Sequence, residues 1–369
     1  MQERVSNSEP AATKRLVSVI LATYNEARFI ACCLASVLSQ HTTSSATGNF
    51  EIEVLAVDGM SDDGTRAILH RHAASDSRLR VIDNPSRSTP FAFNLGLQCA
   101  RGEYVCIFGA HCVYRQDYIA ACLGELMARN AAGCGGRVIT VPAAETLGAR
   151  LVAWTMSNSF GSSSKSFRTQ LEGPVDTVNY PVLRRELVLA VGGYDEELIR
   201  NQDNDLNQRL RAQGHTFWCS WKTQCFYFTK TTVKDLLRYA FKNGYWNVIS
   251  SRKNSSSMGA RHFAPLAFVV CLLLSGLAAA SAFSLHSPFD VLALLPLVLL
   301  LASHLILGSV AAALVSLRER SLAALCLPAI FLAFHIAYGY GSLTGLLSLG
   351  SRGLAVRQQP QQRSIPSQD

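Results

Sequence analysis

Three long apolar segments in the C-terminal third of the chain constrain its fold more than any other feature. Phe263 to Phe283, Val291 to Leu317 and Leu322 to Gly350 contain no Lys, Arg, Asp or Glu. Each reaches the roughly 20 residues that a helix needs to cross the hydrocarbon core of a bilayer. The sequence therefore predicts a membrane domain over residues 263–350 with about three transmembrane helices.

Lys and Arg residues next to these segments predict their orientation. They precede the first segment and separate the second from the third, and they are Arg252, Lys253, Arg261, Arg318 and Arg320. Cytoplasmic flanks of membrane helices carry such residues, so we expect both flanks in the cytoplasm. Three full spans would place the arginines of the polar tail, residues 351–369, outside. The third segment is therefore either a span or a re-entrant segment.

Residues 230–262 join the membrane domain to the preceding part of the chain. Thr232 to Ile249 is predicted as a helix with apolar residues on one side and Lys234, Asp235, Arg238 and Lys242 elsewhere. A basic amphipathic helix before a span is typical of a helix on the bilayer surface. The alternative is a helix packed on its own domain. Similarly, two histidines within the apolar segments, His304 and His335, either pack between helices or line a polar path.

Charge argues against nucleic-acid binding. The formal charge is +8, with 49% hydrophobic and 16% charged residues. The first 248 residues hold 26 basic and 23 acidic residues, a balance of +3, and residues 249–369 hold eight basic and three acidic residues, a balance of +5. A nucleic-acid-binding protein usually concentrates its basic excess on the folded domain. We therefore expect membrane lipids, and no nucleic acid, among the partners.

The eleven cysteines form no Cys-x-x-Cys pair, and most lie in apolar stretches. A buried reduced thiol is the ordinary state of such a residue. We expect neither a zinc site nor a disulfide framework.

Residues 1–15 are polar and predicted to be disordered, and the apolar run Leu16 to Ala22 is too short for a secretory signal. We therefore expect the N-terminal part in the cytoplasm and the protein in the inner membrane as a multi-pass protein. From residue 16 to 229, short apolar runs alternate with helical patterns. The runs are 17–22, 52–57, 79–82 and 104–108, and the helical patterns are 26–40, 62–74 and 90–100. This alternation predicts an α/β domain with a doubly wound, mainly parallel sheet.

The carboxyl ends of parallel strands meet at one edge of a sheet, where ligands bind. The residues after the four runs are Thr23-Tyr24-Asn25-Glu26, Asp58 to Thr65, Asp83 to Arg87, and Gly109-Ala110-His111. No Gly-x-Gly-x-x-Gly follows the first strand and no P-loop motif occurs, which argues against the usual dinucleotide and P-loop sites.

These residues carry a family resemblance. With Asp58-Gly-x-Ser-x-Asp-Gly-Thr65 after the second strand, the chain resembles the family 2 glycosyltransferases of the GT-A fold. Within them it is most similar to bacterial exopolysaccharide transferases of the succinoglycan-synthesis type. The supporting motifs are Thr23 to Glu26, Asn84-Pro85, Asn94-Leu95-Gly96, Ala100 to Glu103, Gly173 to Thr177 and Asn201-Gln202-Asp203. The resemblance covers about Val17 to Trp218.

The resemblance implies a site for a nucleotide-sugar donor. Thr23 and Tyr24 would contact the nucleoside, Glu26 the ribose region and Asp58 the edge of the base. For Asp58 the alternative is a carboxylate that caps a turn or helix. For Thr23 and Tyr24 it is the plain end of a strand.

Four further residues complete the substrate-binding set that the resemblance implies. Arg87 would approach the pyrophosphate as a charged donor, or it is an exposed arginine without a partner. Asn94, His111 and Gln202 belong to the same set. Gln202 stands where many members of the family carry Glu.

Asp203 matches the catalytic base of the family. It would accept the proton of the acceptor hydroxyl while that oxygen attacks the anomeric carbon, with inversion of configuration. Asp205 lies two residues further, and the alternative is that one of these carboxylates caps the following helix.

The chain departs from the family at the metal motif, which is commonly Asp-x-Asp and in the resembling subgroup Asp-x-His. Here the sequence is Gly109-Ala110-His111, so the first carboxylate is missing. Magnesium prefers oxygen ligands, whereas an imidazole suits Mn²⁺ better. Either a divalent cation, Mn²⁺ or Mg²⁺, binds through His111 and the donor pyrophosphate, or no metal binds.

These observations predict a membrane-anchored inverting glycosyltransferase that moves a sugar from a nucleotide-sugar donor to a lipid-linked or saccharide acceptor in exopolysaccharide or cell-surface glycan synthesis. Other polysaccharide-assembly proteins are candidate partners. The alternative is a catalytically silent membrane protein that binds nucleotide sugar or acts as a scaffold. The missing carboxylate at Gly109 favours this alternative, and the retention of Asp58 and Asp203 favours catalysis.

Overall fold

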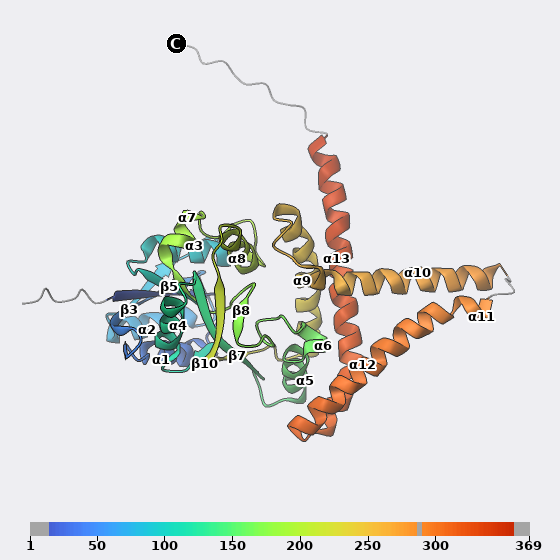
Figure 1. The fold of residues 1–369 in the computed structure, drawn as a ribbon, viewed down its shortest axis with the longest axis horizontal. Coiled ribbons are helices and arrows are strands. Elements are labelled where there is room, and N and C mark those ends of the chain that lie inside the picture. Colours follow the sequence, from blue (N-terminus) through green and yellow to red (C-terminus); the bar gives the residue numbers. More distant parts are fainter. Residues whose placement is uncertain (1–14, 286–289, 358–369) are drawn as a thin grey trace, which may run out of the picture. The chain divides into compact units, whose positions relative to one another are not determined.

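The computed structural model describes residues 15–285 and 290–357 (Figure 1). The predictions for residues 1–14 and 358–369 lie outside the described residues. The chain divides into two compact units, which are described one at a time. Unit 1 contains residues up to Arg137 together with 172–196 and 209–225, and unit 2 contains residues 138–171, 197–208 and 226 onward.

Four parallel strands form the centre of unit 1, in the order β4-β3-β1-β5. Their bounds are β1 (Arg15–Thr23), β3 (Gly48–Asp58), β4 (Leu79–Asp83) and β5 (Tyr104–Gly109). The core residues Val19, Leu55 and Cys106 have no exposure to solvent. Parallel strands are commonly covered on both faces, which explains the continuous apolar runs of β1, β3 and β5. Strand β4, in contrast, exposes Arg80. The predicted strands and the predicted α/β fold are confirmed.

Helices connect these strands. They are α1 (Ile30–Leu38), α2 (Thr65–Ser75) and α3 (Thr89–Cys99). Helix α4 (Tyr118–Ala128) and the short α7 (Arg185–Ala190) come after β5 in the chain. Helix α3 packs closely on β1 at Gly96, where an ideal Cβ would lie only 2.4 Å from Cγ2 of Ile20. The Gly of the Asn94-Leu95-Gly96 motif therefore serves helix-to-sheet packing.

The rest of the sheet is antiparallel, so the sheet as a whole is mixed. Strand β9 pairs antiparallel with both β5 and β7, β8 with β10, and β2 with β3. Their bounds are β2 (Thr43–Ser44), β6 (Cys112–Tyr114), β7 (Gly133–Val141), β8 (Gly173–Val175), β9 (Val182–Arg184) and β10 (Phe217–Phe228). Three of these strands have three residues each. Segments this short leave no periodic signal in a sequence.

Unit 2 contains the long apolar helices. Its elements are α5 (Leu147–Met156), α6 (Ser159–Ser162), the start of α8 (Gln202–Ala212), α9 (Val233–Lys253), α10 (Ala264–Ser284), α11 (Asp290–Ala293), α12 (Leu295–Glu319) and α13 (Leu327–Arg357), with 3₁₀ turns η1 (Ala260–Phe263) and η2 (Leu322–Cys326). Among the described residues, three stretches are long and apolar enough to cross a membrane: 260–284, 291–319 and 322–349, whose 18-residue windows have mean hydropathies of 2.4, 2.5 and 1.9.

The two histidines of these helices face each other. Nε2 of His304 in α12 lies 2.9 Å from Nδ1 of His335 in α13. The ring of Phe160 in α6 packs against both imidazoles and against Phe331, with centroid distances of 5.1 to 5.3 Å. The structure therefore favours the prediction that these histidines pack between helices.

All eleven cysteines lie in the described residues, and all are free thiols. Seven of them are buried. Burial raises the pKa of the Cys106 thiol, which keeps it protonated and unreactive. The expectation of reduced, buried thiols holds for these seven, whereas Cys32, Cys271 and Cys326 are exposed.

Candidate active site

The strand register brings the predicted rim residues of unit 1 together. Thr23 pairs with Asp58 and Asp58 with Asp83 across β1, β3 and β4. On the other side of β1, Ala22 pairs with Gly109. The four strands therefore end level with one another, as ligand-binding edges of parallel sheets require.

Asp58 is fully buried, and the protein itself holds its carboxylate. The backbone N–H of Ser61 donates to Oδ2 over 3.0 Å, and the Ser61 hydroxyl donates to Oδ1 over 2.6 Å. The hydroxyl of Thr23, also buried, donates to Oδ1 over 3.3 Å. In this arrangement Asp58 shapes the turn after β3, as the alternative drawn from the sequence expects.

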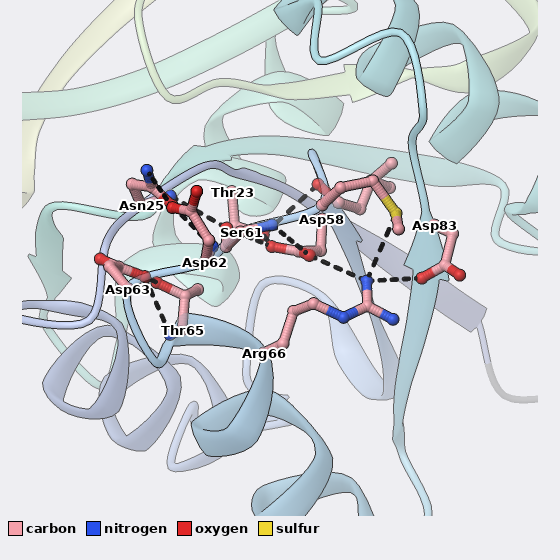
Figure 2. Close-up of polar contacts among 11 residues, drawn as sticks. Thr23, Asn25, Asp58, Ser61, Asp62, Asp63, Thr65, Arg66 and Asp83 are labelled. Carbon is pink, nitrogen blue, oxygen red and sulfur yellow. Dashed lines mark hydrogen bonds and ion pairs between the residues drawn. The ribbon is translucent and has the colours of Figure 1, made fainter.

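A guanidinium links Asp58 to a second, exposed carboxylate (Figure 2). Arg66 in the first turn of α2 donates through Nη1 to Oδ2 of Asp58 over 3.0 Å and to Oδ1 of Asp83 over 2.8 Å. The Asp83 side chain is 55% exposed. Hydrogen bonds to Asp83 and then to Asp58 raise the pKa of Arg66. The rim thus presents an arginine–carboxylate pair to solvent.

Sequence reasoning did not include Arg66 or Asp83 in the predicted site. The available signals were their positions, because Arg66 directly follows the Asp58 to Thr65 motif and Asp83 directly precedes Asn84-Pro85.

The remaining residues of the Asp58 to Thr65 motif tie the loop after β1 to the loop after β3. The Asn25 backbone N–H donates to the Ser61 hydroxyl over 2.9 Å, and the Asn25 amide donates to Asp62 over 3.0 Å. The Glu26 N–H donates to the Thr65 hydroxyl over 2.8 Å. Figure 2 shows Asn25 next to Ser61 and Asp62. The motif therefore fixes the backbone that carries Tyr24 and Glu26.

Tyr24 and Arg87 lie next to each other. Tyr24 is 44% exposed, and Cζ of Arg87 lies 5.7 Å from the centre of its ring. Arg87 adopts a positive φ of 55°. An exposed aromatic ring beside a guanidinium offers both a stacking face and a positive charge, and these suit a base and a phosphate.

Glu26 and His111 also come together. Nδ1 of His111 lies 2.9 Å from Oε1 of Glu26. Within the described parts of the chain, no group of three or more His, Cys, Asp or Glu side chains could hold a metal ion. This pair therefore fits a divalent cation only where phosphate oxygens of a bound donor supply further ligands.

The Tyr180 side chain occupies the space beside Gly109. An ideal Cβ on Gly109 would lie 2.8 Å from Cε1 of Tyr180 and 3.5 Å from Sγ of Cys112. Tyr180 has a positive φ of 53°, and its ring packs edge-on against Tyr114. A carboxylate at position 109 would displace the Tyr180 ring.

Two predicted motifs of unit 1 hold the fold together. The Asn94 amide donates to the Tyr194 carbonyl over 2.8 Å and to Glu196 over 2.9 Å, and its Oδ1 accepts the Tyr194 N–H over 2.8 Å. Arg101 donates to buried Glu53 from its backbone and its side chain. Burial alone would raise the pKa of Glu53, but hydrogen bonds from Ser18 and Arg101 hold it below its usual value.

Gln202, Asp203 and Asp205 lie in unit 2, at the start of α8. Asp203 is half-buried, and its Oδ1 accepts the Asn204 N–H over 3.0 Å. Asp205 is buried and accepts a hydrogen bond from Asn254 over 2.9 Å. Oε1 of Gln202 is buried without a hydrogen-bond partner. Of the two carboxylates, Asp205 is tied into the fold and Asp203 is the more accessible.

Comparison with known proteins identifies the family of the domain that carries these residues. Residues 18–191 match the family described as "Glycosyl transferase family 2". The chain carries a family 2 glycosyltransferase domain. The protein is a glycosyltransferase, and its three apolar C-terminal helices could cross a membrane.

Relatives of this glycosyltransferase work on polysaccharides and glycans. It is 28% identical to the succinoglycan biosynthesis protein ExoA of Rhizobium meliloti, over 71% of this chain and 78% of that protein. It is 25% identical to a dolichyl N-acetyl-alpha-D-glucosaminyl phosphate 3-beta-D-2,3-diacetamido-2,3-dideoxy-beta-D-glucuronosyltransferase of Methanococcus voltae, over 63% of this chain and 76% of that protein.

Among solved structures, the glycosyltransferase is similar to the mannosyltransferase PcManGT of Pyrobaculum calidifontis. The TM-score is 0.52 at 20% identity, over 91% of this chain and 88% of that one. PcManGT was solved in complex with GDP-Man and Mn²⁺. This likeness confirms the GT-A type fold.

Proposed function

We propose that this glycosyltransferase transfers a sugar, with inversion, from a nucleotide-sugar donor to a lipid-linked or saccharide acceptor in exopolysaccharide or cell-surface glycan synthesis. One observation carries the proposal: a family 2 domain places exposed Tyr24, Arg87 and the Arg66–Asp83 pair at the carboxyl ends of its parallel strands. The names of the two relatives support the acceptor class, and GDP-Man bound to PcManGT supports the donor class.

In the proposed donor site, the nucleoside stacks on Tyr24 and the diphosphate lies near Arg87. Glu26 contacts the ribose region and, through its contact with His111, sets the orientation of that imidazole. In this proposal Asp58 and Thr23 take an indirect part, because Asp58 accepts hydrogen bonds from the Ser61 turn and from Arg66, which lie beside the proposed donor. Gln202 also belongs to the proposed substrate-binding set.

Asp203 is the proposed general base. Its carboxylate takes the proton from the acceptor hydroxyl while that oxygen forms a bond to the anomeric carbon. The bond from this carbon to the diphosphate oxygen breaks, and the nucleoside diphosphate leaves. A divalent cation held by His111 and the donor diphosphate would neutralise the charge that develops on the leaving group.

The proposed organisation has a catalytic domain at 16–229, a membrane-surface helix and linker at 230–262 and a membrane domain at 263–350. The catalytic domain faces the cytoplasm of a bacterial cell, and the protein is held in the inner membrane. A catalytic domain in the cytoplasm would take its sugar-nucleotide donor from the cytoplasm. High-salt washing should leave the protein in the membrane fraction, because salt screens charges but does not extract apolar helices.

Incubating the purified protein with radiolabelled sugar nucleotides and membrane lipid extract tests the function. We expect transfer of label to lipid or saccharide from one donor and release of the matching nucleoside diphosphate. The alternative is a silent nucleotide-sugar-binding scaffold, which the side-chain-free position at Gly109 favours. Donor binding by calorimetry with no product from any donor would support that alternative and overturn the proposed activity.

A further inference from the structure

The three apolar helices of unit 2 differ in what surrounds them. Most of α10 and the first half of α12 are exposed on all sides, with Leu277 67% exposed and Val291, just before α12, 72% exposed. In α10 only Val269 and Ala279 are buried. A helix with apolar side chains all round is suited to lipid. At 21 and 25 residues, α10 and α12 are long enough to span a bilayer.

Helix α13, in contrast, is covered along one side by helix α9. Gly341 and Gly244 mark the closest approach: an ideal Cβ on Gly341 would lie 2.0 Å from the carbonyl oxygen of Phe241, and one on Gly244 1.9 Å from that of Tyr338. The hydroxyl of Ser342 donates to the Gly244 carbonyl over 3.1 Å. The Asn247 amide donates to the Tyr338 hydroxyl over 2.6 Å. The two helices therefore form one packed pair.

Helix α9 carries basic residues, which are costly to place in the hydrocarbon core of a bilayer. Lys234, Arg238 and Lys242 follow one another at four-residue spacing on α9, and all three are exposed. Lys242 directly follows Phe241, which packs on α13. Arg238 pairs with Asp235 on the same helix over 2.9 Å. If α13 spanned the bilayer, all four of these exposed or half-exposed charges would lie at membrane depth without the burial that charged residues there need.

The crossing of α10 and α13 is a second argument against α13 as a membrane span. An ideal Cβ on Gly339, in the middle of α13, would lie 2.1 Å from the carbonyl oxygen of Pro265 and 2.5 Å from Cγ2 of Val269. Both residues belong to the first turns of α10. From there α10 runs across α13 and not along it (Figure 1). If α10 follows the membrane normal, α13 lies along the membrane surface.

We propose that α13 and α9 lie together in the surface layer of an anionic bilayer and that only α10 and α12 span it. The open apolar side of α13, with Ile336, Tyr340 and Leu347, faces the acyl chains, and the three basic residues of α9 contact lipid phosphates. Helix α9, with residues packed on α13 and basic residues exposed to solvent, fits the rule for interfacial amphipathic helices. The inference rests on the membrane anchoring in the proposed function but not on sugar transfer.

The two-span arrangement also removes a conflict in the charge pattern. Arg252, Lys253 and Arg261 precede α10. Arg318 lies in the last turn of α12, and Arg320 directly follows this helix. Two spans place all five on one side. The basic tail of the sequence then begins on that side too, as the positive-inside rule favours.

Reporter fusions to the full chain test the number of spans in a bacterial inner membrane. Green fluorescent protein fluoresces there only in the cytoplasm, and alkaline phosphatase is active only outside. With green fluorescent protein fused after Asp369, we expect fluorescence. With alkaline phosphatase at the same position, we expect at least tenfold less phosphatase activity than with a phosphatase inserted after Leu285, between α10 and α12. An active C-terminal phosphatase and a dark fluorescent protein would establish three spans and overturn the proposal.

Nanodiscs test the lipid contact of α9 separately. The melting temperature of the wild type should be higher in discs of phosphatidylcholine with phosphatidylglycerol than in discs of phosphatidylcholine alone. A Lys234→Glu/Arg238→Glu/Lys242→Glu variant should lose this difference, while Arg71→Glu, an exposed substitution in unit 1, should keep it. Equal lipid dependence in all three proteins would contradict the proposed surface. A failure of sugar transfer changes neither measurement.

Discussion

Nη1 of Arg66 lies 3.0 Å from Oδ2 of Asp58, a carboxylate without any exposure to solvent. Truncation of this arginine removes a charged donor from a buried acceptor, which then keeps only its Ser61 and Thr23 donors. We expect Arg66→Ala to lower the free energy of unfolding by about 1–3 kcal/mol. The measurement is denaturant unfolding in detergent.

Asp83→Asn is the matched control, because it changes the exposed partner of the same guanidinium. It should cost less than about 1 kcal/mol while weakening donor binding. Equal destabilisation by the two variants would mean that Arg66 does not support Asp58.

The second prediction concerns the catalytic base. Asp203→Asn keeps the shape of the side chain but cannot take a proton at neutral pH, so the transfer rate should fall about a hundred- to ten-thousandfold with donor affinity nearly unchanged. Single-turnover transfer and calorimetric donor binding give the two readouts. Asp205→Asn should be milder in rate and should lower the melting temperature, because Asp205 is tied to Asn254. If the Asp203 variant keeps more than about a tenth of the rate, the assignment fails.

The third prediction concerns Gly109 and Tyr180. Gly109→Asp alone should lower the melting temperature, because its Cβ would meet the Tyr180 ring at 2.8 Å. Gly109→Asp with Tyr180→Gly supplies both the carboxylate and its space, and glycine accepts the positive φ at position 180. The double variant should reach half-maximal rate at about tenfold less Mn²⁺, the size of effect that ligand-shell changes have on metal affinity.

Chelation decides whether a cation takes part in the wild type at all. A transfer rate unchanged by EDTA would contradict a metal requirement, whatever the Gly109 variants do. In that case positively charged groups such as Arg87 would stabilise the leaving diphosphate.

A fourth prediction follows from Glu53. Its pKa lies below the usual value, so its ionised form stabilises the fold above the pKa of an unfolded glutamate, about 4.3. This contribution is lost as the pH falls through the lower folded-state pKa. Glu53→Gln should therefore reduce stability at pH 7 and flatten its dependence on pH below about 4.3. A variant with the same acid-unfolding profile as the wild type would rule out this linkage.

Much of unit 1 could be predicted because β1, β3 and β5 are buried along most of their length. The runs at 17–22 and 52–57 fall within β1 and β3 for this reason. The antiparallel strands were missed because β6, β8 and β9 are held by their neighbours in the sheet and not by a pattern of their own.

The site was less predictable than the fold. Whether Asp58 faces a ligand or a turn depends on where Ser61 and Arg66 place their donors, and this is fixed only once α2 packs against β4. The occupation of the Gly109 space by Tyr180 depends on a residue from a distant segment. Motif order located the rim, but it could not assign each side chain to the ligand or to the protein.

The packing of Phe160 has a consequence for handling the protein. Its ring holds the first residues of the Gly/Ser-rich stretch 160–166 against histidines of α12 and α13. A detergent that wedges these helices apart would release that stretch while leaving the sheet intact. Release of the stretch should then be reversible on return to lipid, and circular dichroism would show no unfolding. The choice of detergent therefore tests how firmly the helices hold residues 160–166.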